Sequence, residues 1–119
     1  MNAYSQALTA YSSHYSVQSP RSLEVVAFNQ ANARLRAATS FPQIAEALHR
    51  NRELWSIIAT DVASEGNKLP PEVRARLFYL AEFTQSHSRK VLKDEAKVAP
   101  LIEINEAMIS GLSGVGVDE

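Results

Sequence analysis

Hydrophobic side chains recur three and four positions apart along most of this chain, which is the spacing of one face of an α-helix. The clearest stripe lies between residues 40 and 64 and consists of Ile44, Leu48, Trp55, Ile58 and Val62. A helix advances about 100° per residue, so these side chains point in one direction. Similar stripes follow at residues 71–92 and 100–112, and no segment shows the strict alternation that is typical of a strand.

Two asparagines occupy positions where this spacing would place a leucine. Asn51 lies in the middle of the first stripe, and Asn105 lies in the last one, among Leu101, Ile104 and Met108. A buried amide without a partner costs about 1–3 kcal/mol, so each asparagine needs a hydrogen bond. We expect the two to bond each other or helix ends inside the core. In the alternative interpretation, one of them meets the backbone or an amide of a bound helix.

Helix starts are marked by capping residues. Ser19 before Pro20 predicts a helix that runs to about residue 38. Ser40 and Gln43 match the capping box, which predicts a helix to about residue 64. The Pro70-Pro71 pair opens a helix to about residue 92.

Helix ends are predicted from glycines and charged residues. Gly66 suits a left-handed cap after the second helix, and residues 93–99 form a charged connector. Pro100 starts the last helix, and Gly111 is expected to end it. The sequence therefore predicts an all-α fold, a single-domain bundle of four to five helices with short loops. The domain spans residues 1–112, including an N-terminal helical arm at 1–18, and residues 113–119 form a flexible C-terminal tail.

The N-terminal arm carries an aromatic face. Tyr4, Leu8, Tyr11 and Tyr15 follow one another at helical spacing. An isolated helix of this length is marginal in water, so it must dock on something. It docks either on its own domain or on a partner, since tyrosine combines large contact area with low entropy cost.

A second group of apolar side chains lies off the main stripes and is the candidate for contact with a partner. Its members are Val25, Phe28, Leu35, Leu54, Ile57, Phe78 and Phe83. A groove between helices with such walls could take an amphipathic guest helix, and Asp at Phe28 or Ile57 should then weaken binding without loss of helicity. Trp55 is either a core residue or a binding hot spot, and Arg52 joins Asn51 and Asn105 among the candidate contacts. Alternatively, the helices bury the whole group.

Composition narrows the function classes. The 119 residues fit one domain, and the formal net charge of −1 argues against a dedicated nucleic-acid binder. The absence of cysteine excludes a thiol nucleophile and a cysteine-ligated metal site. Neither a secretory signal nor an apolar stretch of about 20 residues is visible, so a cytoplasmic protein is expected.

No catalytic motif is present in the sequence. His14, His49 and His87 are far apart, and no serine elbow or phosphate loop occurs. We therefore expect no enzyme activity, no metal and no cofactor. Arginines come in pairs two positions apart at residues 34/36, 50/52 and 74/76, and such pairs do not share a helix face. An RNA-binding surface would require them to converge in three dimensions.

The sequence resembles the FlaF family of alphaproteobacterial flagellar biosynthesis regulators from the N-terminal arm to about Leu112. The matching pieces are Ala10-Tyr11, Ser19-Pro20-Arg21, Asn51-Arg52-Glu53-Leu54-Trp55, Thr60-Asp61, Asn67-Lys68-Leu69-Pro70, Arg74-Ala75-Arg76-Leu77, Leu80-Ala81-Glu82-Phe83, His87, Val91-Leu92 and Leu101-Ile102-Glu103-Ile104-Asn105. The chain departs from the family pattern at Ser22, where an acidic residue is expected, and at residues 91–96, which lack an expected glycine.

The resemblance implies a small cytoplasmic helical protein that supports flagellin production and flagellum assembly. It implies flagellin as the partner, bound as a secretion chaperone or translational activator would bind it, and FlbT as a possible second partner that opposes flagellin synthesis at the messenger. A chaperone of this kind would shield the amphipathic terminal helices of flagellin. The alternative is an RNA-binding post-transcriptional regulator that acts on the flagellin messenger.

Overall fold

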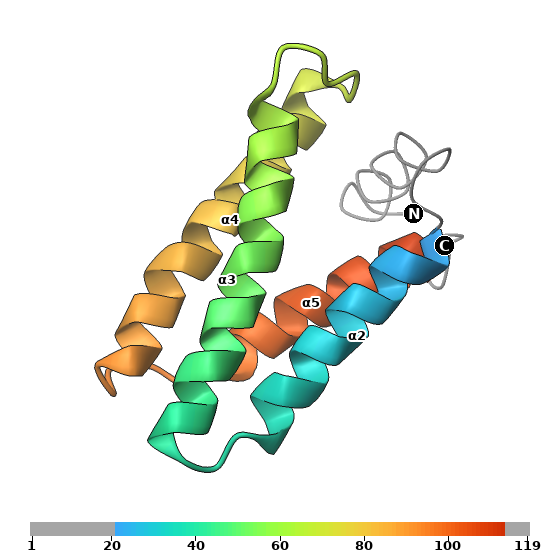
Figure 1. Ribbon diagram of the computed structural model, residues 1–119. Coiled ribbons are helices and arrows are strands. Elements are labelled where there is room, and N and C mark those ends of the chain that lie inside the picture. The colour runs from blue at the N-terminus through green and yellow to red at the C-terminus, as the bar shows by residue number, and fades with distance from the viewer. Residues whose placement is uncertain (1–20, 114–119) are drawn as a thin grey trace.

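The computed structural model describes residues 21–113, and every regular element in that range is a helix (Figure 1). The helices are α2 (Arg21–Ala37), α3 (Phe41–Ala63), α4 (Pro71–Leu92) and α5 (Ala99–Ser113). The prediction of an all-α bundle is confirmed. The tyrosine face of the N-terminal arm and the tail after Ser113 lie outside the described residues.

The four helices form two pairs. α3 and α4 lie side by side as one antiparallel hairpin, and α2 lies antiparallel beside α5 (Figure 1). The two pairs cross each other at a wide angle and meet near the turn that joins α2 to α3. Because α5 returns along α2, the beginning of α2 and the end of α5 lie at the same end of the molecule.

The start of α3 follows the predicted capping box. The Oγ of Ser40 accepts a hydrogen bond from the backbone N–H of Gln43 at 3.3 Å, and the Gln43 Oε1 accepts one from the backbone N–H of Ser40. The backbone N–H of Thr39 donates to the same Oε1 at 2.9 Å. These bonds satisfy amides that the first helical turn leaves free, so they fix where α3 begins.

Two predicted helix ends are wrong. α3 ends without a left-handed glycine, because Ser64 adopts an extended backbone and its N–H and Oγ both donate to the Asp61 carbonyl. Gly66 lies in the following turn without a left-handed φ. Gly111 does not end α5 either. It is buried within the helix, which continues to Ser113.

α4 is capped by a residue with a left-handed backbone conformation, although residues 91–96 contain no glycine. Asp94 has a φ of 61°. The N–H of Asp94 donates to the Val91 carbonyl at 3.0 Å, and the N–H of Glu95 donates to the Lys90 carbonyl at 2.8 Å. These two bonds define a Schellman cap. An aspartate therefore occupies the backbone position for which a glycine was expected, since Asp tolerates this conformation better than most residues.

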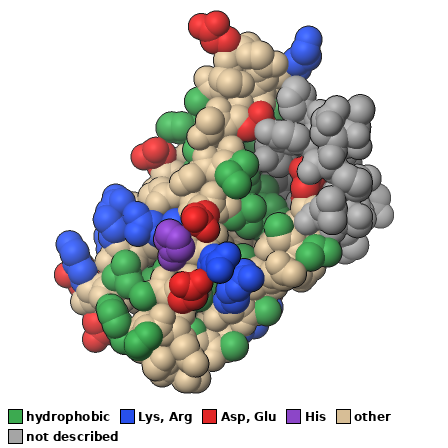
Figure 2. Space-filling view, viewed as in Figure 1, with side chains coloured by type: hydrophobic (Ala, Val, Ile, Leu, Met, Phe, Trp, Pro, Cys, Tyr) green, Lys and Arg blue, Asp and Glu red, His purple; other side chains and the backbone are tan. Residues whose placement is uncertain are grey.

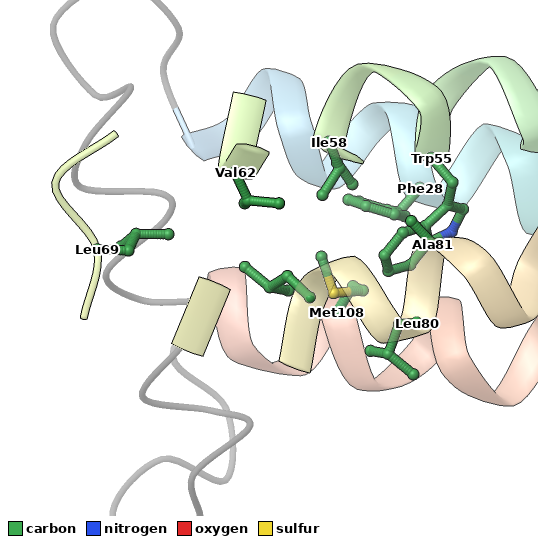
Figure 3. Packing of buried hydrophobic residues seen from close by; sticks show 9 residues of the cluster. Phe28, Trp55, Ile58, Val62, Leu69, Leu80, Ala81 and Met108 are labelled. Atoms are coloured by element: carbon green, nitrogen blue, oxygen red, sulfur yellow. The ribbon is translucent and has the colours of Figure 1, made fainter. Parts of the chain in front are cut away.

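The core consists of two apolar clusters. The larger cluster gathers around Trp55 and contains Phe28, Ile58, Val62, Leu69, Leu77, Leu80, Ala81 and Met108 (Figure 3). The smaller cluster contains Leu35, Ala47, Leu48 and Leu101. On α2, α3 and α5 a buried asparagine separates the residues of one cluster from those of the other. We call Asn32, Asn51, Thr84, Ser88 and Asn105 the polar layer.

Candidate functional site

Asn105 is the hub of the polar layer. Its Oδ1 accepts a hydrogen bond from the indole Nε1 of Trp55 at 2.9 Å. Its Nδ2 donates to the Oδ1 of Asn51 at 2.7 Å and to the Oδ1 of Asn32 at 3.0 Å. All four residues are buried, so directional bonds join α2, α3 and α5 inside the core.

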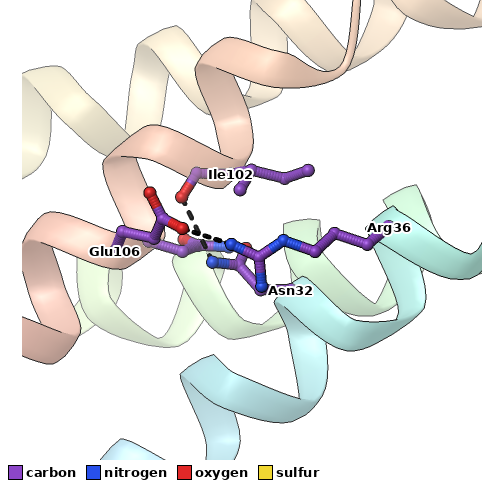
Figure 4. A network of polar contacts seen from close by, with 5 residues as sticks. Asn32, Arg36, Ile102 and Glu106 are labelled. Carbon is purple, nitrogen blue, oxygen red and sulfur yellow. Dashed lines mark hydrogen bonds and ion pairs between the residues drawn. The ribbon is translucent and has the colours of Figure 1, made fainter.

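Asn32 extends this network along α5. Its Nδ2 donates to the backbone carbonyl of Ile102 at 3.2 Å (Figure 4). Nearby, Arg36 of α2 forms an ion pair with Glu106 of α5 at the exposed edge of the same helix pair. One face of α2 is thus held to α5 by a buried amide and an exposed charge pair.

Three polar groups of the layer have no hydrogen-bond partner within the described residues. They are the Nδ2 of Asn51, the Oγ1 of Thr84 and the Oγ of Ser88. Thr84 and Ser88 lie one turn apart on α4, so they bring polar groups from the fourth helix into the layer without bonding it to the hub. The network is complete around Asn105 and incomplete toward α4.

The expected structural role of the asparagines is confirmed. The side chains of Asn51 and Asn105 are hydrogen-bonded to each other in the core. Trp55 is also a core residue, and its ring meets the Phe28 ring edge to face with the ring centroids 5.9 Å apart. These side chains cannot meet a partner while the bundle has this packing.

The predicted partner surface also needs correction on α2. Phe28 is 2% exposed and belongs to the larger cluster, and Leu35 belongs to the smaller one. The expectation that Asp at Phe28 leaves the fold intact is therefore wrong, because an unpaired charge would be placed in the core.

Several other candidates are half-buried. Val25 and Leu54 pack against the larger cluster. The Phe83 ring stacks on the His87 ring, with the two ring centroids 5.1 Å apart. The Nε of Arg52 donates to the Oε1 of Gln85 at 2.8 Å, and the Gln85 Nε2 donates back to the Arg52 carbonyl, so Arg52 joins α3 to α4.

Large apolar side chains remain exposed on the outer faces of α3 and α4. Ile57 is 62% exposed and Phe78 is 40% exposed. Tyr79, which the sequence analysis passed over, is 65% exposed, and Phe41 and Val26 are exposed as well. Tyr79 lies between Leu77 and Leu80 in the sequence, and both of these leucines belong to the buried stripe. Around the helix axis, however, Tyr79 points about 160–200° away from Leu77, toward the face expected to carry polar residues. A large aromatic residue on that face is the sign of an exposed apolar contact.

The arginines are distributed among different partners. Arg50 pairs with Glu46 at 2.8 Å, and the hydrogen bond and charge of Arg50 lower the pKa of the Glu46 carboxyl. Arg36 pairs with Glu106, and Arg74 donates to backbone carbonyls at the end of α3. In Figure 2 acidic, basic and histidine side chains lie beside one another on the face shown. Two of these arginines are paired with carboxylates and Arg74 is held by backbone carbonyls, and this arrangement does not favour a phosphate-binding surface.

Clusters of metal-ligating side chains and membrane-spanning helices are both absent from residues 21–113. No group of three or more potential ligands among His, Asp and Glu comes together in that range. None of its helices is long and apolar enough to cross a membrane.

The comparisons with known proteins identify the family. Neither the curated proteins nor the solved structures contain a match to this chain. The model of the family described as flagellar protein FlaF matches residues 4–112, which include all of the polar layer and both exposed faces of α3 and α4. The chain therefore belongs to the FlaF family of flagellar proteins.

Proposed function

We propose that this protein binds flagellin in the manner of a chaperone, in the cytoplasm, and promotes its translation or secretion for flagellum assembly. Family membership supports the flagellar role. The observation that carries the binding proposal is the exposure of Ile57, Phe78 and Tyr79 on helices whose other faces already form a closed core. Large apolar side chains that remain in water on a finished fold are typical of protein-binding sites.

The energetic basis is the burial of apolar surface on both partners. An exposed side chain on this bundle and an apolar side chain of an amphipathic flagellin helix leave water together, which contributes about 25 cal/mol per Å² before ordering costs. A flagellin helix covered in this way cannot associate with a second flagellin. The bound protein would then stay available for export.

A pull-down with purified flagellin tests the proposal, and we expect a complex at micromolar concentrations. The double variant Ile57→Asp/Phe78→Asp should bind at least tenfold more weakly, because each carboxylate would lose water without gaining a partner. The control is Thr60→Asp, an exposed change on α3 that adds one negative charge where the double variant adds two.

Circular dichroism should show the same helicity for all three proteins. Failure of the unaltered protein to bind flagellin would overturn the proposal. Equal weakening by Thr60→Asp would replace apolar contact with simple charge repulsion as the explanation.

A further inference from the structure

The end of the α3–α4 hairpin is built as a rigid platform. The Nε of Arg74 donates to the Val62 carbonyl at 2.8 Å, and the Nη2 of the same guanidinium donates to the Ser64 carbonyl at 3.1 Å. In the turn, the Asn67 Nδ2 donates to the Asp61 carboxylate, and the Asn67 Oδ1 accepts from the Leu69 N–H. The Arg74 bonds satisfy carbonyls that the end of α3 would otherwise leave free, and the Asn67 bonds join the turn to α3 and to Leu69, so the hairpin end is well bonded.

Two shallow hollows lie on this platform. The first, of about 380 Å³, is lined by Val62, Ala63, Pro71, Arg74, Ala75 and Phe78. The second, of about 480 Å³, is lined by Glu72, Ala75, Arg76 and Tyr79. Ala75 belongs to both, so the hollows are adjacent. We call the exposed residues Ala63, Pro71, Ala75, Phe78 and Tyr79 the tip surface.

The small side chains of the tip surface permit close approach of another backbone. Ala63 and Ala75 are exposed, and both line the first hollow. Phe78 and Tyr79 are consecutive residues of α4, so their side chains diverge by about 100° around the helix axis, on either side of the shared Ala75. A guest helix that lies over Ala75 could present two apolar side chains three or four positions apart, one to each hollow.

The size of the tip surface argues against a second copy of this chain as the occupant. A fully covered Phe or Tyr buries about 150–250 Å², and here each ring is about half exposed. Together with the alanines and proline, the surface offers on the order of 300–400 Å². A stable dimer buries about 800 Å² on each partner, so this surface suits a short segment instead.

We infer that the tip surface docks one amphipathic helix of the partner, with two apolar side chains one turn apart entering the hollows at Phe78 and Tyr79. This inference rests on the proposed function, because the helix is taken to be a segment of flagellin. It assigns this one helix to the hairpin end. Ile57 lines a separate hollow, so it would contact another part of the partner.

The test is the affinity of the full chain for purified flagellin, measured by titration calorimetry. The variant Phe78→Ser/Tyr79→Ser should bind at least tenfold more weakly. The matched control Phe41→Ser removes an aromatic side chain that is 63% exposed and lies outside the tip surface, and it should change the affinity less than threefold. A thermal melt of each variant establishes that it is folded at the temperature of the titration.

The outcomes separate the two claims. Absence of binding by the unaltered protein removes the proposed function and this inference with it. Binding that survives the tip substitutions, or that Phe41→Ser weakens as much, keeps the proposed function and overturns the tip surface. Sedimentation of the protein alone supplies a second arm: a dimer that the tip substitutions dissociate would make a second copy the occupant and would also overturn the inference.

Discussion

The interior of the bundle and the end of the α3–α4 hairpin reverse the usual distribution of side chains. The polar layer places amides and hydroxyls where leucines would fit, and the tip surface places aromatic rings where charged residues would fit. The first arrangement is stable because Asn105 satisfies three partners at once. The second has no compensation within the described residues, which is why we assign it to a partner.

The comparison separates stability from binding. A group buried in the interior contributes to stability through bonds that are lost only on unfolding. A group exposed in both the folded and unfolded states contributes little to stability and is free to serve a contact. Substitutions in the two regions should therefore change different measurements.

The largest effect is expected at the hub. Asn105→Leu removes the partners of the Trp55 Nε1 and of two amide oxygens, each a loss of about 1–3 kcal/mol, so the free energy of unfolding should fall by about 3 kcal/mol or more. Asn51→Leu should cost less, because the Asn105 Nδ2 keeps its bond to Asn32. Chemical denaturation measures both. A smaller effect at Asn105 than at Asn51 would mean that Asn105 is not the hub.

A change of opposite sign is expected on the α4 side of the layer. The Thr84 hydroxyl is buried without a partner in the described residues, and Val has nearly the same shape without the hydroxyl. Thr84→Val should therefore raise the free energy of unfolding by about 1 kcal/mol. The matched change Thr60→Val lies on the exposed surface of α3 and should stay within about 0.5 kcal/mol of the unaltered protein. Destabilisation by Thr84→Val would show that the hydroxyl has a partner in solution.

At the tip surface the stability should barely respond. Tyr79→Ser removes a ring that is mostly in water, so the free energy of unfolding should change by no more than about 0.5 kcal/mol. Denaturation under the conditions used for Asn105→Leu gives the comparison directly. A loss as large as that of the hub variant would make Tyr79 a structural residue and would contradict its assignment to binding.

The smallest effect concerns an exposed charge pair and depends on pH. Arg50 lowers the pKa of Glu46 from its usual value of 4.5, so the pair stabilises the fold above that value and loses its effect as the pH falls through the lowered pKa. Glu46→Gln should be slightly less stable than the unaltered protein at pH 7, and the difference should shrink as the pH falls below 4.5. Melting temperatures across this pH range measure it. A difference that grows toward acid pH would contradict the sign.

The positions of the helices followed from the sequence because their signals are local. The capping box at Ser40 fixes the start of α3 through bonds within a few residues, and Pro71 at the first position of α4 favours a helix start through its fixed φ. The two buried asparagines were also predicted to find partners, since an isolated buried amide is too costly. Asn32 was missed, although it lies four residues after Phe28 and three before Leu35 on the same face.

The partner surface was less predictable because helical spacing gives a direction but not a neighbour. α2 has apolar residues on two sides, and the pattern does not say which side is covered. The structure buries Phe28 and Leu35 against α3 and α5 and leaves Val26 in water. On α4 the same ambiguity favoured Phe83 as a partner contact, although Phe83 packs on His87. Tyr79, which is exposed, was not predicted.

The pairing of α2 with α5 has a consequence for the order of events during synthesis. The bonds of Asn105 join residues that are 50, 54 and 73 positions apart in the chain, whereas the α3–α4 hairpin closes over a single short turn. Short loops close sooner than long ones. During synthesis the α3–α4 hairpin can therefore form before α5 has emerged to pack on α2. α5 therefore completes the interior after the hairpin has formed. A polypeptide truncated before Asn105 would form the α3–α4 hairpin but not the four-helix bundle.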